Sequence, residues 1–306
     1  MICLDKNDNS KDLIQQIQTF IFDCDGVLWA GKTKINGAGK VIKMLKKKNK
    51  QILYVTNAST KTTDILIDKF DRLDIHIQPE NLIHAGLATA FYLNNLNLKS
   101  KSNIYIVGSK NLQQTLIKNT KNLIFSGLND NNKTLRTFSE NNKELDLLLS
   151  DIKSNTYSAV VVGWDNEFNT YKLAKVCSIL KYQKKCHFIS SNNDFTAPFS
   201  PELVMPASGS IISAIETASG RKSICVGKPS KELGINIISK FNLNPSKTCM
   251  IGDRIDSDLY FGKNSGFKTC IVLSGVTDLE MLQELDPERK PDFYANSIAS
   301  LLDIKE

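Results

Sequence analysis

Acidic residues stand directly behind two apolar segments that are typical of buried β-strands. Asp23 and Asp25 follow residues 19–22, and Asp253 follows residues 248–251. Two carboxylates that lie close together repel each other unless a proton or a cation separates them. A hard cation with oxygen ligands, such as Mg²⁺, relieves that repulsion. These residues therefore predict a metal site, with the alternative that Asp23 and Asp25 belong to a turn that caps the next segment.

Hydroxyl, amide and ammonium groups follow two further apolar segments. Thr56 and Asn57 come after residues 52–55, and Lys228 comes after residues 224–226. Side chains of these types can bind phosphate oxygens through hydrogen bonds or charge. Each of these patterns is weak alone, because such residues are also common in surface turns. Their joint order along the chain is what favours a phosphoryl-transfer site.

The residue types suggest a division of roles around a phosphorus atom. Asp23 is the expected nucleophile, because a carboxylate attacks phosphorus once cations and donors neutralise the phosphate. Asp25 is the expected general acid toward the leaving oxygen and then the base that activates water. Its backbone carbonyl could also reach the metal. Asp253 is expected to complete the Mg²⁺ site together with Asp23 and Asp25.

The remaining polar residues are expected to surround the transferred group. Thr56, Asn57 and Lys228 would stabilise the charge on the phosphoryl oxygens, and Lys228 thereby counts among the catalytic residues. Asp258, which closely follows Asp253, would support the site from outside, through water or through Lys228.

Alternating strands and helices must position these residues. Amphipathic helices are expected at 38–48 and 63–73, between short β-branched segments. Such alternation predicts a doubly wound parallel α/β sheet, whose ligands bind at the carboxyl ends of the strands. The expected strands are residues 19–22, 52–55, 104–107, 159–162, 187–189, 224–226, 248–251 and 269–273.

The ordered set of motifs resembles the haloacid dehalogenase (HAD) superfamily of phosphohydrolases. Its four motifs are similar to Asp23-Cys-Asp25-Gly, Thr56-Asn57, Lys228-Pro and the acidic segment from Gly252 to Asp258. The resemblance implies a Rossmann-like core with a parallel sheet, Mg²⁺ dependence and an aspartyl-phosphate intermediate. A dehalogenase activity is disfavoured, because those members lack the second acid of the first motif.

The long stretch between Thr56 and Lys228 exceeds what a minimal core needs. The resemblance implies an inserted α/β cap at 100–221, which leaves a discontinuous catalytic core at 1–99 and 222–306. It points to the group of 4-nitrophenylphosphatases, phosphoglycolate phosphatases and pyridoxal phosphatases. Members of this group tend to dimerise through the cap, so a homodimer is expected.

Asn192 and Asp194 belong to the cap segment that, by resemblance, reaches over the core and binds substrate. The alternative is a loop stabilised by Asx turns. The resemblance implies small phosphomonoester substrates: 2-phosphoglycolate first, 4-nitrophenyl phosphate as an artificial substrate, and pyridoxal phosphate as the alternative. A phosphoprotein substrate, a receiver-like signalling module and a non-catalytic binding protein of the same fold are the lesser alternatives.

Composition narrows the class without choosing a substrate. The 306 residues carry 39 Lys and Arg against 32 Asp and Glu, a moderate excess that does not predict nucleic-acid binding. Seven cysteines without metal-binding spacing, a charged N-terminal segment and no long apolar run favour a cytoplasmic protein that does not enter membranes. Cys24 is rejected as a nucleophile, because its acidic neighbours should raise its pKa. Trp29 is expected in the core or, alternatively, in the pocket lining.

Overall fold

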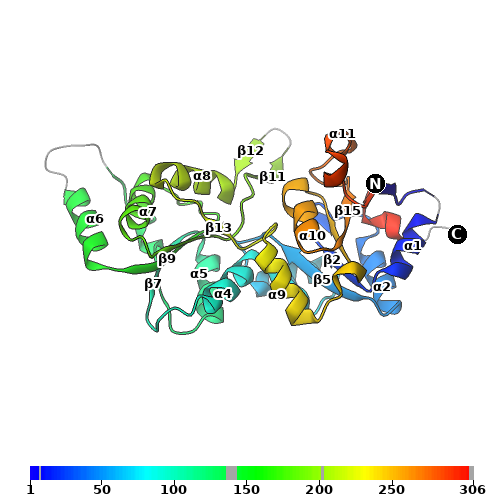
Figure 1. Cartoon of the computed structure of the whole chain (residues 1–306), viewed down its shortest axis with the longest axis horizontal. Helices are drawn as coiled ribbons and strands as arrows, with labels where there is room; N and C mark the ends of the chain where they lie inside the picture. Colours follow the sequence, from blue (N-terminus) through cyan, green and yellow to red (C-terminus); the bar gives the residue numbers. More distant parts are fainter. Residues whose placement is uncertain (7, 136–142, 201–202, 303–306) are drawn as a thin grey trace. The chain divides into compact units, whose positions relative to one another are not determined.

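The computed structural model describes residues 1–6, 8–135, 143–200 and 203–302, and its chain divides into two compact units (Figure 1). The first unit comprises residues 1–56, 63–83 and 228–306, and the second comprises residues 57–62 and 84–227. The expected borders were 1–99, 100–221 and 222–306. The second unit therefore also takes in residues 84–99 and 222–227, as well as the short segment 57–62.

A seven-stranded sheet forms the centre of the first unit, in the order β1-β16-β15-β14-β2-β5-β6. The pairs from β1 to β5 are parallel. This arrangement, together with the second sheet, confirms the expected α/β class. The strands are β1 (Ile2–Cys3), β16 (Phe293–Ala295), β15 (Lys268–Val272), β14 (Thr248–Gly252), β2 (Thr19–Phe22), β5 (Gln51–Thr56) and β6 (Leu82–His84).

Helices bury apolar side chains on both faces of this sheet. Apolar residues of α1, α2 and α3 join the strands in one large cluster, and Leu259, Ile271 and Leu282 form a smaller cluster with partly buried neighbours. A small hairpin of β3 (Trp29–Ala30) and β4 (Thr33–Lys34) follows β2. The helices are α1 (Asn9–Gln16), α2 (Ala38–Lys47), α3 (Thr63–Arg72), α9 (Lys231–Phe241), a π-helical segment (Ile255–Leu259), α10 (Tyr260–Asn264) and α11 (Leu279–Glu284).

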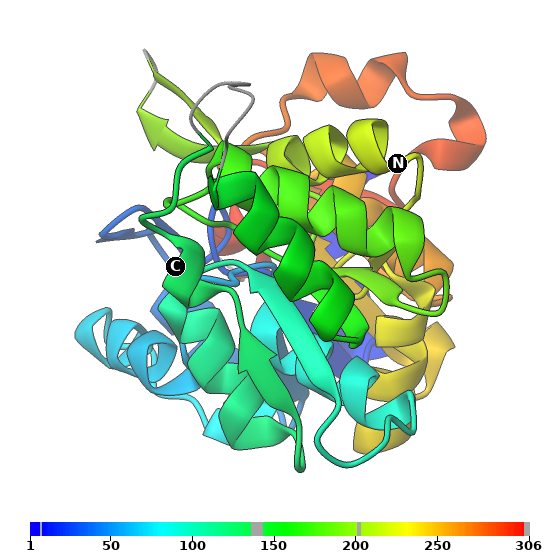
Figure 2. The same ribbon diagram turned by 90° about the vertical axis from the view of Figure 1, so that its left-hand side faces the viewer.

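The second unit contains a five-stranded parallel sheet in the order β13-β10-β9-β7-β8. Figures 1 and 2 show α4 and α5 on one side of it and α6, α7 and α8 on the other. The strands are β7 (Asn103–Val107), β8 (Ile124–Ser126), β9 (Tyr157–Val162), β10 (His187–Ser190) and β13 (Ile224–Cys225), and the helices are α4 (Ala85–Asn95), α5 (Lys110–Asn119), α6 (Lys143–Ser154), α7 (Thr170–Tyr182) and α8 (Ser208–Ser219). An antiparallel hairpin of β11 (Thr196–Ser200) and β12 (Leu203–Pro206) completes the unit.

Strand β7 shows why this sheet is covered on both faces. Ile104 and Ile106 belong to the apolar cluster with α4 and α5, and Tyr105 and Val107 belong to the cluster with α6, α7 and α8. Successive side chains of a strand point to opposite faces, so a strand that is apolar throughout must be buried on both.

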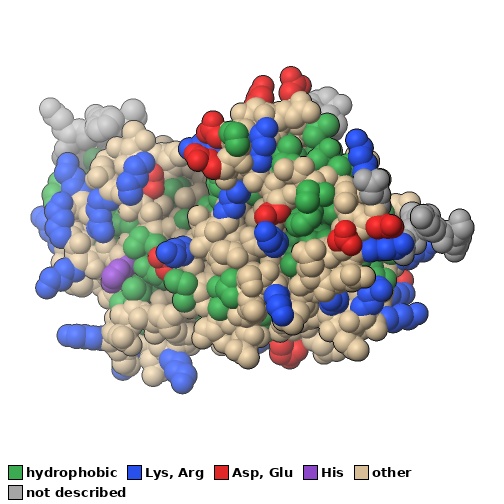
Figure 3. Space-filling model, turned by 45° about the vertical axis from the view of Figure 1, so that its right-hand side comes forward, with side chains coloured by type: hydrophobic (Ala, Val, Ile, Leu, Met, Phe, Trp, Pro, Cys, Tyr) green, Lys and Arg blue, Asp and Glu red, His purple; other side chains and the backbone are tan. Residues whose placement is uncertain are grey.

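Charged side chains are distributed over the surface seen in Figure 3. Lys and Arg side chains are spread over this face with Asp and Glu side chains among them, so the positive excess does not gather into one patch there. Among the described residues, no helix is both long and apolar enough to cross a membrane.

Candidate active site

Three neighbouring strands of the first unit deliver polar residues to the same edge of the sheet. Strand β2 lies between β14 and β5, and all three are parallel. Asp23 directly follows β2, Asp253 directly follows β14, and Thr56 is the last residue of β5. All three residues are buried, with at most 7% of their surface exposed. The carboxyl edge of the sheet therefore brings together residues that are far apart in the sequence.

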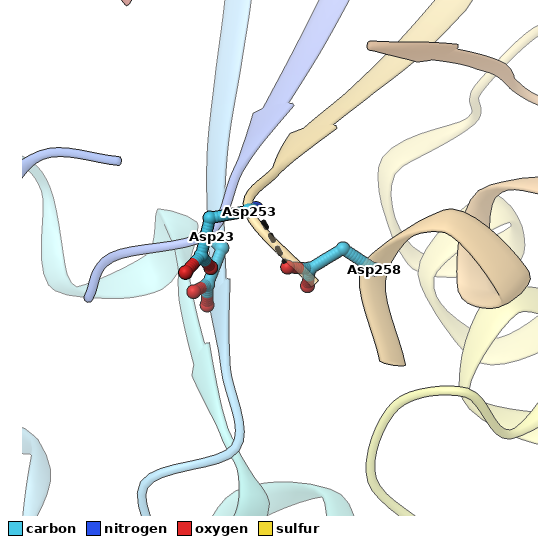
Figure 4. Close-up of side chains that lie close together, drawn as sticks. All are labelled: Asp23, Asp253 and Asp258. Atoms are coloured by element: carbon cyan, nitrogen blue, oxygen red, sulfur yellow. Dashed lines mark hydrogen bonds between the residues drawn. The ribbon is translucent and has the colours of Figure 1, made fainter. Parts of the chain in front are cut away.

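Three carboxylates meet at this edge (Figure 4). Asp23, Asp253 and Asp258 each offer one oxygen to a group of atoms that lie within 4.8 Å of one another. Asp258 comes from the π-helical segment that follows β14. Figure 4 shows the side chains of Asp23 and Asp253 next to each other, with Asp258 reaching back toward the backbone of Asp253.

Lys228 lies against two of these carboxylates. Its Nζ donates to Oδ1 of Asp23 and to Oδ1 of Asp258, both at 2.6 Å, and the lysine is only 2% exposed. The other oxygen of Asp258 accepts the backbone N–H groups of Asp253 and Arg254. Asp258 thus fixes both Lys228 and the turn after β14, and so holds two parts of the site in position.

Burial dominates the electrostatics of this group. It raises the pKa of Asp23 and, together with the charge of Asp258, raises the pKa of Asp253 to about 7. Burial alone would lower the pKa of Lys228, but the charges of Asp23 and Asp258 outweigh it and raise that pKa. Three carboxylates face one ammonium group, so the ionised site carries an excess of negative charge.

The donor set of the site fits a divalent cation. Oδ1 of Asp253 is buried and has no hydrogen-bond partner among the described residues, whereas Oδ2 accepts the backbone N–H of Val276 at 2.9 Å. A buried carboxylate oxygen without a partner is costly. A hard cation between Asp23 and Asp253 would satisfy that oxygen and offset the excess negative charge.

The side chain of Asp25 does not join the group of carboxylates. Its Oδ1 accepts the indole N–H of Trp29 at 2.8 Å and lies 3.5 Å from Nζ of Lys69. A part for Asp25 in the metal site therefore depends on its backbone carbonyl. Lys69 was not among the residues expected at the site, and Trp29 was expected in the core or, alternatively, in the pocket lining. The DxDGxxW spacing places Trp29 four residues after Asp25, which was a signal for this contact.

The loop after β15 is a further part of the site that the sequence motifs did not reveal. Oγ of Ser274 donates to the backbone carbonyl of Gly26 at 2.7 Å, and the N–H of Val276 binds Asp253. A Cβ at Gly26 or at Gly275 would collide with the carboxylate of Asp253, and Gly26 also has a positive φ of 80°. The polar pair Ser274-Gly275, which follows an expected strand, is the signal that could have identified this loop.

Asn57, Asn192 and Asp194 form a hydrogen-bonded set within the second unit. Nδ2 of Asn57 donates to Asp194 at 3.0 Å, and Nδ2 of Asn192 donates to the backbone carbonyl of Asn57 at 2.9 Å. Oδ1 of Asn192 accepts the N–H of Asp194, as in an Asx turn. Asn192 is only 3% exposed, and these contacts show it stabilising a loop. An Asx turn is therefore present in this loop, and the expected binding of substrate by Asn192 and Asp194 stays a prediction.

Cys24 is fully buried between the two acidic residues of its loop. Its thiol pKa is raised, as expected, although burial contributes more than the charges of Asp23 and Asp25. A thiol with a raised pKa is a poor nucleophile. The structure therefore supports the carboxylate of Asp23, rather than the thiol, as the nucleophile.

Comparison with known proteins agrees with this geometry. Residues 20–120 match the family described as haloacid dehalogenase-like hydrolase, and residues 225–301 match the one described as HAD-hydrolase-like. Phosphoglycolate phosphatase 1A of Arabidopsis thaliana is 32% identical over 97% of this chain and 80% of its own length. The chain belongs to the haloacid dehalogenase-like hydrolases.

Other relatives define the activity more closely. Glycerol-3-phosphate phosphatase of Gallus gallus is 30% identical over 97% of this chain and 95% of its own length. The structure of 4-nitrophenylphosphatase from Thermotoga maritima matches with a TM-score of 0.76 and 26% identity, over 94% of this chain and 97% of that one. The chain is a phosphomonoester hydrolase, as the sequence motifs indicated.

Proposed function

We propose that the protein is a Mg²⁺-dependent phosphatase that hydrolyses small phosphomonoesters through a phosphorylated Asp23. The observation that carries the proposal is the buried carboxylate of Asp23, held 2.6 Å from the ammonium group of Lys228 beside Asp253. A nucleophilic carboxylate needs positive charge next to it, because its target, a phosphate ester, is itself an anion. Lys228 supplies part of that charge.

Asp23 and Asp253 would hold the Mg²⁺ ion, with the backbone carbonyl of Asp25 as a further ligand. The ion would supply positive charge that offsets the charge of the phosphate group and of the carboxylates. Asp258 would keep Lys228 and the backbone of Asp253 in position. Thr56, at the end of β5, would donate to a phosphate oxygen.

The reaction requires two displacements at phosphorus. In the first, an oxygen of Asp23 forms a bond to phosphorus while the bond to the ester oxygen breaks, and protonated Asp25 gives its proton to the departing alkoxide. In the second, ionised Asp25 takes a proton from water. The water oxygen attacks phosphorus, the bond to Asp23 breaks, and inorganic phosphate leaves with Asp25 protonated again.

The relatives favour short, anionic or polar phosphomonoesters as substrates. Two of them are named as phosphatases of phosphoglycolate and of glycerol 3-phosphate, at 32% and 30% identity. We expect 2-phosphoglycolate to be the preferred substrate and 4-nitrophenyl phosphate to serve as an artificial one. Pyridoxal phosphate is the second candidate substrate, because chronophin of Homo sapiens, a pyridoxal phosphatase, is also 30% identical to this chain.

A substrate panel tests the proposal. The measurement is kcat/KM for 2-phosphoglycolate, glycerol 3-phosphate, pyridoxal phosphate and 4-nitrophenyl phosphate, with Mg²⁺ and with EDTA. We expect the highest value for 2-phosphoglycolate, and loss of turnover with EDTA and in Asp23→Asn. Full turnover by Asp23→Asn would overturn the mechanism. A preference for pyridoxal phosphate would make it, rather than 2-phosphoglycolate, the proposed substrate.

A further inference from the structure

The indole ring of Trp29 is built into the first unit as a rigid group. The residue is fully buried and belongs to the main apolar cluster, where its ring meets the ring of Phe70 edge-on at 4.8 Å between centroids. A buried indole N–H must find an acceptor or lose its hydrogen bond to water. Here the acceptor is Oδ1 of Asp25, at 2.8 Å.

The backbone of the loop folds Trp29 back onto Asp25. The carbonyl of Cys24 accepts the N–H groups of Leu28 and Trp29 at 2.8 and 3.2 Å, and the N–H of Gly26 donates to the carbonyl of Trp29 at 2.7 Å. The same loop that carries the expected proton donor therefore also carries the group that holds it. Because the loop is closed by its own hydrogen bonds, this contact does not depend on a flexible side chain.

Lys69 of α3 supports the same arrangement from the ring face. Its Nζ lies 4.2 Å from the centroid of the Trp29 ring and 3.5 Å from Oδ1 of Asp25. A cation over an aromatic face is attracted by the ring, and here the carboxylate of Asp25 attracts the same ammonium group. The lysine side chain is 14% exposed, whereas that of Asp25 is 41% exposed and would otherwise be free to change rotamer.

Both contacts go to the same oxygen of Asp25. Oδ2 of Asp25 has no hydrogen-bond partner among the residues that the structure describes. The carboxyl group is thus held through one oxygen and left open at the other. A general acid must meet the leaving oxygen at hydrogen-bond distance, so fixing its rotamer in advance contributes directly to the rate.

We propose that Trp29 is a positioning residue for proton transfer: its indole N–H, supported by Lys69, fixes Asp25 so that Oδ2 gives the proton to the leaving group. This inference rests on the proposed function, in which Asp25 is the proton donor. Trp29 itself touches neither the phosphate nor the nucleophile. Its removal should therefore impair those reactions that need a proton on the leaving group, and spare those that do not.

Two aryl phosphates of similar shape test this division. Phenolate leaves poorly and needs a proton, whereas 4-nitrophenolate leaves well without one. We expect Trp29→Phe to lower kcat/KM about tenfold or more for phenyl phosphate and by less than about threefold for 4-nitrophenyl phosphate, a part of what a general acid contributes. Asp25→Asn should show the same selectivity more strongly. Lys69→Met should show it more weakly, and serves as the second variant if Trp29→Phe folds poorly.

Phe70→Leu is the matched control, because it loosens the packing of the indole without removing the bond to Asp25. It should change kcat/KM for the two esters by the same factor. An equal loss on both esters in Trp29→Phe and Lys69→Met, beside a selective loss in Asp25→Asn, would overturn the positioning role alone. A lack of selectivity in Asp25→Asn would overturn both the proton-donor role of Asp25 and the inference.

Discussion

Each unit of the molecule buries a lysine between two aspartates, and the two clusters differ in how their charges are matched. In the first unit, Lys228 contacts Asp23 and Asp258. In the second unit, Lys175 of α7 contacts Asp130 at 3.0 Å and Asp151 at 2.6 Å. The contact distances in the two clusters are similar, although the side chain of Asp151 is 32% exposed and that of Asp258 only 1%.

The cluster of the second unit has a partner for every charge. Asp130 accepts from the phenol of Tyr105 at 2.7 Å and lies 2.7 Å from Nζ of Lys133, in addition to its contact with Lys175. Burial raises the pKa of Asp130, but the hydrogen bonds from Lys133, Tyr105 and Lys175 outweigh it, so the pKa is lowered. Such a network favours one folded arrangement. Because its polar groups already have partners, a ligand would gain few interactions there.

The cluster of the first unit is under-neutralised. The pKa of both Asp23 and Asp253 is raised, and Oδ1 of Asp253 has no partner among the described residues. A pair of buried clusters with the same residue types can thus serve stability in one place and chemistry in the other. The two clusters differ in how much positive charge the chain itself provides. In the first cluster, a bound cation would supply the missing positive charge, and the substrate would complete the remaining interactions.

Replacement of the aspartates should separate the two clusters most strongly. Asp23→Asn should lower kcat at least about 10⁴-fold, because the nucleophile is lost, while the protein stays folded. Asp130→Asn should keep kcat and lower the free energy of unfolding by about 3 kcal/mol, since Lys175 and Lys133 lose a shared partner. Steady-state kinetics and urea unfolding check both. A larger loss of kcat in Asp130→Asn than in Asp23→Asn would refute the contrast.

Replacement of the two lysines should also affect activity in the first cluster and stability in the second, with a smaller effect than replacement of the aspartates. Lys228→Met should reduce kcat/KM about 10²- to 10³-fold, the range for removal of one charge-stabilising donor at a site of this kind. Lys175→Met should leave kcat/KM of the folded protein unchanged and lower the unfolding midpoint. Measurement of both quantities on both variants shows whether each lysine serves chemistry or stability.

Metal binding should stabilise the protein only through the first cluster. Mg²⁺ at about 100 times its dissociation constant should add about 2.7 kcal/mol to the free energy of unfolding of the wild type. Asp253→Asn should lose this gain and Asp130→Asn should keep it. Thermal unfolding with and without Mg²⁺ measures the gain independently of activity. An equal gain in Asp253→Asn would remove that residue from the metal site.

Low pH should reduce the stabilisation that the second cluster contributes, and this is the smallest of the expected effects. The pKa of Asp130 is lowered from its ordinary value of 3.8, so its ionised form stabilises the folded chain above that pH. This stabilisation is lost as the pH falls through the lowered pKa, where the folded state takes up the proton. The difference in unfolding free energy between wild type and Asp130→Asn should therefore shrink at low pH. A difference that grows toward low pH would contradict the assignment.

Several features of the molecule were accessible from local sequence alone. All eight expected strands and both expected helices are present to within two residues, because short apolar, β-branched segments are typical of buried strands and apolar patterns of period 3.6 are typical of helices. Asp23, Thr56 and Asp253 could be placed at strand ends for the same reason. The proposed roles of these residues, the cap-mediated homodimer and the cytoplasmic location stay predictions.

Other features required the folded chain. The loop at Ser274 and Val276 reaches Asp253 from a different strand end, and no motif marked it. Asn192 stabilises its own loop, since its side-chain amide forms hydrogen bonds with the backbone of Asn57 and of Asp194. The border between the units also shifted, because helix α4 makes its apolar contacts with the second sheet rather than the first.

What the sequence by itself determined was the set of chemical groups and the strand ends that carry them, because both follow from residue type and local periodicity. What only the tertiary structure decided was which groups satisfy one another. The indole of Trp29 holds Asp25, Asp258 holds Lys228, and Asp253 keeps one oxygen without a partner among the described residues. Such matching depends on distances of a few ångströms between segments far apart in the chain, and local sequence does not encode those distances.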